Sequence, residues 1–208
     1  MNANAPTLQS LGQSSIDQFL DQLGAKQPTP GGGAAASVAG AVGAALGQMV
    51  LAYSLGKKAL AEHQELLEQA MAALTRARGM FLTLAQEDAA AYAVLNELMR
   101  LPAEDARRKQ EWDAAVAASV RPPMASLALS SETARVLTGL CGTTNTQLKS
   151  DLAIAGILVE AAAAAAKWNV VINVPLLPEG EREKMLADAA RMHEACAAAR
   201  THIEKACG

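Results

Sequence analysis

The chain has 208 residues, enough for one ordinary domain with a buried core. Hydrophobic residues make up 51% of it but aromatic residues only 3%, so we expect helices that pack closely through small side chains, mainly alanine. Eighteen basic and 21 acidic residues give a net charge of −3 without any basic block, which argues against nucleic acid as a partner.

The N-terminus is polar and lacks both the basic start and the apolar run of a signal peptide. Residues 1–12 are predicted to form a flexible tail, and residues 13–208 a single helical domain. Cys141, Cys196 and Cys207 are odd in number, widely spaced and not arranged as Cys-x-x-Cys. We therefore expect reduced thiols and a cytoplasmic protein.

About six helices are predicted, and no stretch keeps the two-residue alternation of a strand. Ser15 and Gln18 form a capping box at the start of the first helix, and Gly24 ends it. Pro122 and Pro123 are expected to kink or break the fourth helix. The expected ranges are 16–23, 34–55, 58–100, 103–140, 148–171 and 179–206. The predicted fold is all-α, an elongated bundle with long central helices.

The stretch from Gln27 to Gly56 contains no charged residue and is long enough to cross a bilayer. It is rich in alanine and glycine, contains Gln48 and Ser54, lacks aromatic residues at both ends and is followed by no second expected span. These features favour a helix buried in protein, so no membrane partner is expected.

Small residues recur on one face of the second helix, at Ala36, Gly40, Gly43 and Gly47. Each glycine costs about 1 kcal/mol of helix propensity, so another helix should approach this face closely. The contact is either inside the subunit or across a subunit interface.

The segment Pro28-Thr29-Pro30-Gly31-Gly32-Gly33 leads directly into that helix. Its backbone N–H groups and the helix dipole would favour an anion or a polar ring in front of them. No Lys-Ser or Lys-Thr follows and no strand precedes, so ATP and NAD are disfavoured. A plain tight turn is the alternative.

Asp88 interrupts an apolar stripe on the third helix that includes Leu74, Phe81 and Leu95. A buried carboxylate needs either a cationic partner or a shifted pKa, and the latter would suit proton chemistry. Glu87 beside it should face solvent. A paired structural aspartate and a catalytic one are equally compatible with this pattern.

Polar residues also flank an alanine-lined face of the fifth helix. Ser150 and Asp151 lie in its first turn, where a carboxylate gains from the helix dipole. Asn169 and Asn173 near its end are poor helix formers, so they satisfy backbone groups or bind a ligand. Lys57 and Lys58 follow Gly56, where they cap the preceding helix or bind a substrate carboxylate.

The histidines His63, His193 and His202 show none of the spacings of a metal site, so no metal is assigned.

Together these motifs resemble the cyclodeaminase/cyclohydrolase family of folate enzymes. The resemblance is carried by the following segments, in order along nearly the whole chain: Pro28–Gly33, Gly56–Lys58, Asp88–Tyr92, Arg100–Pro102, Asn145, Ser150–Leu152 and Asn169–Asn173. The chain departs from the family pattern at Arg121-Pro122-Pro123-Met124 and at Tyr92, where phenylalanine is usual.

The resemblance implies an all-helical homodimer with a folate pocket and neither metal nor cofactor. It implies that Asp88 is the active-site aspartate. It also implies that the substrate-binding residues include Pro30, Gly31, Gly32, Gly33, Lys57, Lys58, Asn145, Ser150, Asp151, Asn169 and Asn173.

The leading hypothesis is hydrolysis of 5,10-methenyltetrahydrofolate to 10-formyltetrahydrofolate, with Asp88 as general base and acid. The alternative reaction is cyclodeamination of 5-formiminotetrahydrofolate with loss of ammonia. The chain has no fused transferase domain in these residues, which favours the first hypothesis. A helical interaction module without catalysis is the third.

Overall fold

The protein is seen in a computed structural model that describes residues 11–208. Within this range all regular structure is helical, which confirms the predicted all-α class. The α-helices are α1 (Ile16–Gly24), α2 (Gly32–Ala52), α3 (Gln64–Arg100), α4 (Ala106–Gly139), α5 (Lys149–Asn173) and α6 (Glu179–Cys207). Short 3-10 helices cover Leu11–Gln13, Lys58–His63, Thr146–Leu148 and Val174–Leu176.

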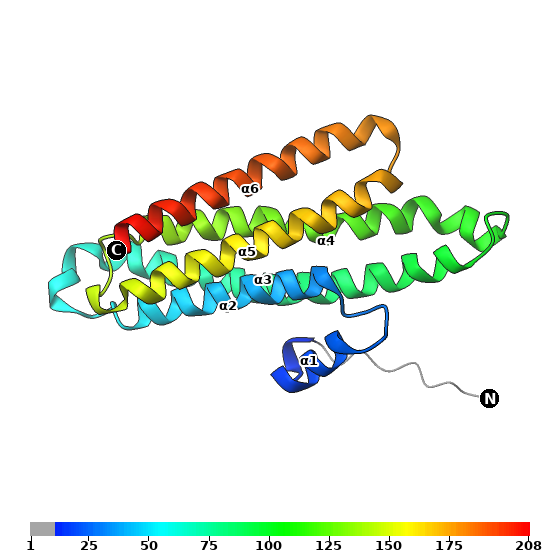
Figure 1. The fold of residues 1–208 in the computed structure, drawn as a ribbon. Coiled ribbons are helices and arrows are strands. Elements are labelled where there is room, and N and C mark those ends of the chain that lie inside the picture. Colours follow the sequence, from blue (N-terminus) through cyan, green and yellow to red (C-terminus); the bar gives the residue numbers. More distant parts are fainter. Residues whose placement is uncertain (1–10) are drawn as a thin grey trace.

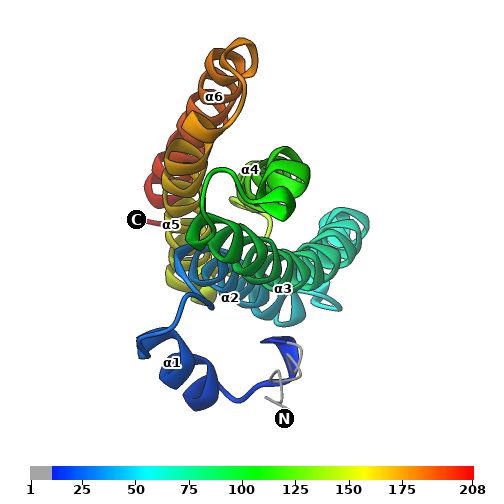
Figure 2. The same cartoon turned by 90° about the vertical axis from the view of Figure 1, so that its right-hand side faces the viewer.

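Four antiparallel neighbours, α2, α3, α4 and α5, form a closed bundle in which each helix contacts the next and α5 returns to α2. The sixth helix packs over α4 and α5, and the view along the bundle shows it as the outermost helix on that side (Figures 1 and 2). The short α1 lies outside the bundle, below the start of α2 (Figure 1), and contacts α2 and α3 through its partly buried Phe19. One end of the bundle therefore carries the start of α2, the ends of α3 and α5, and the start of α4.

The small-residue face of α2 is an intramolecular contact, which decides between the two possibilities left open by the sequence. A Cβ at Gly40 would lie 2.6 Å from the Phe81 ring, and one at Gly47 would lie 2.8 Å from a Leu137 methyl group. A Cβ at Gly43 would lie 2.8 Å from a methyl group of Val159 on α5. Because α3, α4 and α5 all approach this face, it is buried within one subunit and supplies no argument for a dimer.

The predicted start of the first helix is confirmed, whereas the predicted end of the second and the predicted start of the third are wrong. The capping box of α1 is present, with the Gln18 N–H donating to Ser15 Oγ at 3.1 Å and the Ser15 N–H donating to Gln18 Oε1 at 2.9 Å. The second helix was expected to run to residue 55, but α2 ends at Ala52. In the turn that follows, Gly56 adopts a positive φ of 75°, a conformation that favours glycine. The segment after Lys57 begins as a 3-10 turn, so α3 itself starts at Gln64 rather than Lys58.

The predicted tail lies almost entirely outside the described residues. Its last two members, Leu11 and Gly12, belong to the first 3-10 helix, which contacts α3.

The expected break at Pro122 and Pro123 is absent, because α4 continues from Ala106 to Gly139 through both prolines. Pro123 has no N–H to donate to the carbonyl of Ser119, four residues earlier in the helix. The side-chain amide of Asn173 on α5 donates to that carbonyl instead, at 3.1 Å. The neighbouring helix thus replaces one of the missing hydrogen bonds.

Two stretches, Gly32–Ala52 and Thr146–Leu176, are long and apolar enough to cross a membrane by length and composition alone. Only the first was expected from the sequence, and the expectation that no second such stretch follows was wrong. In the bundle α2 packs against both α3 and α5, as the core helix of a globular domain does.

Candidate active site

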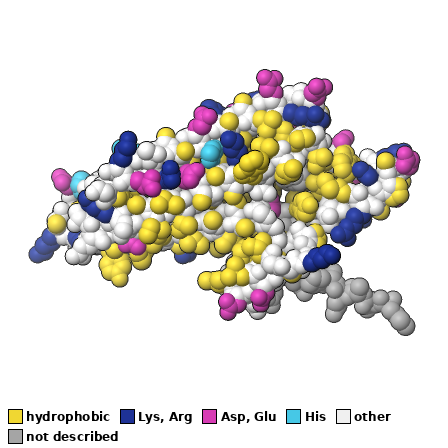
Figure 3. All heavy atoms as spheres, in the orientation of Figure 1, with side chains coloured by type: hydrophobic (Ala, Val, Ile, Leu, Met, Phe, Trp, Pro, Cys, Tyr) yellow, Lys and Arg dark blue, Asp and Glu magenta, His cyan; other side chains and the backbone are white. Residues whose placement is uncertain are grey.

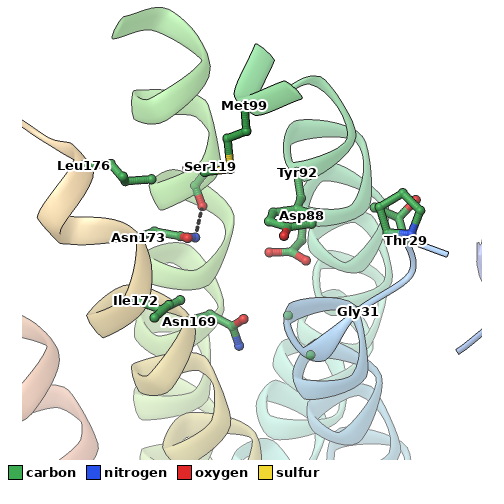
Figure 4. Close-up of a pocket in the computed structure, with 13 residues that line it drawn as sticks. Thr29, Gly31, Asp88, Tyr92, Met99, Ser119, Asn169, Ile172, Asn173 and Leu176 are labelled. Atoms are coloured by element: carbon green, nitrogen blue, oxygen red, sulfur yellow. Dashed lines mark hydrogen bonds between the residues drawn. The ribbon is translucent and has the colours of Figure 1, made fainter. Parts of the chain in front are cut away.

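A pocket of about 420 Å³ opens at the end of the bundle where α2 begins. One wall comes from α3 and the segment before α2, and the opposite wall from the end of α5, with Ser119 of α4 between them (Figure 4). The lining residues are Pro28, Thr29, Gly31, Gly32, Gly33, Asp88, Tyr92, Met99, Ser119, Asn169, Ile172, Asn173 and Leu176. This volume lies in the ordinary range for small-molecule sites.

Asp88 is the one charged side chain among these lining residues. As the stripe predicted, it lies on the inward face of α3, since Leu74, Phe81 and Leu95 are fully buried and Glu87 is exposed. Burial raises the pKa of Asp88 from 3.8 to about 6, and a hydrogen bond from the backbone N–H of Ala34 opposes this rise. No cationic side chain is among the described residues that line the pocket beside Asp88, so of the two possibilities that the sequence left open, burial with a raised pKa is the one that fits the structure.

Glycine is required at position 33 because the Asp88 carboxyl group packs directly on the first turn of α2. A Cβ at Gly33 would overlap the carboxyl carbon and both oxygens of Asp88. The first turn of a helix has free N–H groups and a partial positive charge, which favour a carboxylate at this place. The absence of a side chain at Gly33 thus leaves room for the Asp88 carboxyl group, and the glycine-rich segment also forms one side of the pocket.

Asn169 and Asn173 lie one turn apart on the opposite wall (Figure 4). The Nδ2 of Asn169 donates to the carbonyl oxygen of Ala165 at 3.0 Å, and that of Asn173 donates to Ser119 on α4 at 3.1 Å. Both amides therefore satisfy backbone groups, as one of the two expectations had it, and both also line the pocket, where ligand binding stays a prediction.

The other predicted site residues are not brought into this pocket. The helix α2 has 21 residues and spans about 32 Å, which separates the glycine-rich segment from the residues that follow α2. Lys57 and Lys58 are exposed at the far end of the bundle. At that same end lie Asn145, Ser150 and Asp151, at the start of α5 or just before it.

Asn145 has a structural role in this far end. Its backbone N–H donates to Ser54 Oγ at 2.9 Å, and its side-chain oxygen accepts from the N–H of Gln147 at 3.3 Å. Near the pocket, Pro30 is buried but does not line the cavity.

Several residues that line the pocket were not among the predicted site residues. They are Pro28 and Thr29 beside the glycines, Tyr92 and Met99 on α3, Ser119 on α4, and Ile172 and Leu176 near the end of α5. The sequence could have indicated Ser119. It precedes Pro123 by four residues, so its carbonyl has no helical N–H to accept from and is free for another donor. The sequence could also have indicated Tyr92 and Met99, because they follow Asp88 by four and eleven residues and so share its face of α3. It could not have indicated Ile172 and Leu176, because core and pocket side chains have the same composition.

No group of three or more His, Cys, Asp or Glu residues in the described part of the chain is arranged to hold a metal ion.

The family model described as formiminotransferase-cyclodeaminase matches residues 15–192, a range that contains every residue of the pocket. The chain belongs to this family. The resemblance based on the sequence motifs is thus confirmed.

Similar proteins are named for each of the two expected activities, the cyclohydrolase and the cyclodeaminase. The methenyltetrahydrofolate cyclohydrolase of Methylorubrum extorquens is 29% identical, over 88% of this chain and 94% of its own length. The formimidoyltransferase-cyclodeaminase of Gallus gallus is 28% identical over 76% of this chain, which matches only 30% of that longer protein. The formiminotetrahydrofolate cyclodeaminase structure from Thermotoga maritima superposes with a TM-score of 0.85 at 26% identity, covering 94% of this chain and 96% of that one.

Proposed function

We propose that the protein is a methenyltetrahydrofolate cyclohydrolase, which hydrolyses 5,10-methenyltetrahydrofolate to 10-formyltetrahydrofolate. The observation that carries this proposal is the half-buried Asp88 carboxyl group, with its pKa near 6, as the single charge in a pocket of suitable size. The substrate is a cation, so a lone carboxylate complements it. The M. extorquens cyclohydrolase, which aligns over most of both chains, supports the same reaction.

The proposed mechanism uses Asp88 twice. The ionised carboxylate takes a proton from a water molecule as the water oxygen attacks the carbon that bridges N5 and N10. The bond between this carbon and N5 then breaks, Asp88 returns its proton to N5, and the hydroxyl proton is released as the formyl group forms on N10. A pKa near 6 suits both steps at neutral pH, because the carboxylate is mostly ionised yet readily protonated. This scheme needs no metal and no cofactor.

The second candidate is cyclodeamination of 5-formiminotetrahydrofolate. It forms the same bridged cation and requires a proton on the departing nitrogen, which the protonated form of Asp88 would supply. The T. maritima cyclodeaminase supports this candidate through its similar fold and its high coverage of both chains.

The experiment that separates these functions follows the absorbance of methenyltetrahydrofolate in chelator-treated buffer. We expect enzyme-dependent loss of this absorbance above the spontaneous rate. If the absorbance instead appears when 5-formiminotetrahydrofolate is supplied and methenyltetrahydrofolate stays intact, the protein is a cyclodeaminase. No change with either substrate would contradict both reactions and favour an interaction module.

We further propose that the protein forms a homodimer through an apolar face shared by α2 and α5. Hydrophobic side chains gather over these helices on the face shown in Figure 3. The exposed members are Val42 and Met49 on α2, Tyr53 directly after it, and Ile154, Ile157, Trp168 and Ile172 on α5. No charged residue lies on α2. An exposed apolar surface of this extent along two neighbouring helices is typical of an interface.

Sedimentation equilibrium tests this proposal. We expect twice the monomer mass for the unaltered protein, and dissociation for the variant Val42→Glu with Ile157→Glu, whose two charges would be buried in the interface. Lys109→Glu, on the exposed side of α4, is the control and should remain dimeric. A monomer mass for the unaltered protein at micromolar concentration would contradict the proposal.

A further inference from the structure

The side-chain amides of Asn169 and Asn173 are fixed in orientation by the backbone groups that they bind. A carbonyl oxygen can only accept, so the amide atom that faces it must be nitrogen. Ala165 supplies that carbonyl for Asn169, and Ser119 supplies it for Asn173. Both Oδ1 atoms are thereby left without a donor among the described residues of the protein.

These two oxygens give the α5 wall the character of a hydrogen-bond acceptor. The Ser119 hydroxyl on the adjoining wall does not add a donor, because it donates to the backbone carbonyl of Val116 at 2.8 Å. Asp88 across the pocket is also an acceptor when ionised (Figure 4). A ligand that satisfies this pocket must therefore present several N–H groups.

The reduced pterin ring system of a folate has such groups, namely the 2-amino group and N3–H of its pyrimidine ring and N8–H of its reduced pyrazine ring. The formyl or hydroxyl oxygen that develops at the reacting carbon would instead require donors. Acceptors on the α5 wall therefore match the ring rather than the reacting carbon.

Resting on the proposed folate function, we propose that the Oδ1 atoms of Asn169 and Asn173 accept hydrogen bonds from the N–H groups of the pterin ring, and that Pro123 is a positioning residue for Asn173. Pro123 fills this role by lacking an N–H. The Ser119 carbonyl is left free, and this carbonyl holds the Asn173 amide with its oxygen available to the ligand.

The two adjacent prolines provide a matched test. In Pro123→Ala the new N–H donates to the Ser119 carbonyl within the helix, so it competes with the Asn173 amide for that oxygen and weakens the hold on Asn173. In Pro122→Ala the new N–H meets the carbonyl of Ala118, which no asparagine side chain binds among the described residues. Both changes replace a proline inside a helix with a residue that has an N–H and a high helix propensity. Both should therefore preserve or raise the melting temperature.

Steady-state kinetics with the substrate that the unaltered protein turns over should separate the two variants. We expect KM to rise about tenfold in Pro123→Ala with kcat within about twofold, while Pro122→Ala keeps both constants. Asn173→Ala should raise KM similarly, and adding Pro123→Ala to it should change KM no further, because both act through one hydrogen bond. An unchanged KM in Pro123→Ala, or an equal rise in Pro122→Ala, would overturn the role of Pro123.

Binding measurements test the direction of the hydrogen bonds. Isothermal titration should show 5-formyltetrahydrofolate binding at least about tenfold more tightly than its analogue without the 2-amino group. That preference should diminish in the double variant Asn169→Ala with Asn173→Ala. An undiminished preference would overturn the acceptor assignment while the folate function stands, whereas an unaltered protein that acts on neither folate would overturn both.

Discussion

Replacing Asp88 with asparagine should lower kcat by at least about a hundredfold and, at the same time, stabilise the folded protein at pH 7. Asparagine keeps the size of the side chain but can neither take a proton from water nor return one to N5, and general acid–base catalysis contributes about 10²- to 10⁴-fold. Turnover of the variant at the rate of the unaltered protein would exclude the mechanism.

The stability gain follows from the raised pKa. The folded protein keeps a proton on Asp88 up to about pH 6, whereas the unfolded chain loses it near pH 3.8. The contribution of Asp88 to stability therefore declines as the pH rises through this window, by up to about 3 kcal/mol at pH 7. Urea unfolding should show Asp88→Asn to be more stable than the unaltered protein at pH 7 and nearly equal to it at pH 4. A variant that is less stable at pH 7 would show that Asp88 is stabilised by its surroundings.

The same pKa predicts the pH dependence of the unaltered enzyme. Because the ionised carboxylate is the base, kcat/KM should fall below about pH 6 after the spontaneous reaction is subtracted. An inflection near pH 4 would mean that Asp88 titrates as an exposed aspartate does.

Replacing Gly33 with alanine should reduce kcat by about a hundredfold or more, although every catalytic group remains present. The new Cβ would overlap the Asp88 carboxyl group and force it away from the start of α2. Misplacement of a catalytic group by about 1 Å costs roughly a hundredfold in rate. The rate should be measured together with the circular dichroism spectrum, which should remain helical.

Gly79→Ala is the control for Gly33→Ala, since a Cβ at this α3 position would meet nothing within 4 Å. It should keep full activity and gain up to about 1 kcal/mol of stability from helix propensity. Full activity in Gly33→Ala would show that Asp88 does not depend on its place against α2.

The elements that could be predicted from sequence are those set by local rules. The capping box at Ser15 depends on a few neighbouring residues, and Asp88 was visible because one carboxylate interrupts a long apolar stripe. The unbroken α4 could not be predicted, because the donor that replaces one missing hydrogen bond comes from Asn173, on another helix.

The predicted site grouped residues from both ends of the bundle. In an antiparallel bundle the start of one helix lies beside the end of its neighbour, so Gly33 on α2 meets Asp88 and Asn169 near the ends of α3 and α5. Lys57, after the end of α2, and Asp151, at the start of α5, lie at the opposite end of the bundle for the same reason. Sequence motifs alone do not show that these residues lie at opposite ends. The length of α2, together with the alternating direction of neighbouring helices, does show it.

The weak attachment of α1 gives the pocket two sides of unequal stability. No residue of α1 is fully buried, and its Phe19 side chain packs only partly against Ala34, Ala85 and Ala89. The wall formed by Pro28 and Thr29 continues directly from this helix, whereas Asp88 and Asn173 belong to long helices of the bundle. Local opening costs least where least surface is buried, so hydrogen exchange should be fastest along α1. The side of the pocket that carries Asp88 can thus stay rigid while the side formed by Pro28 and Thr29 opens and closes locally.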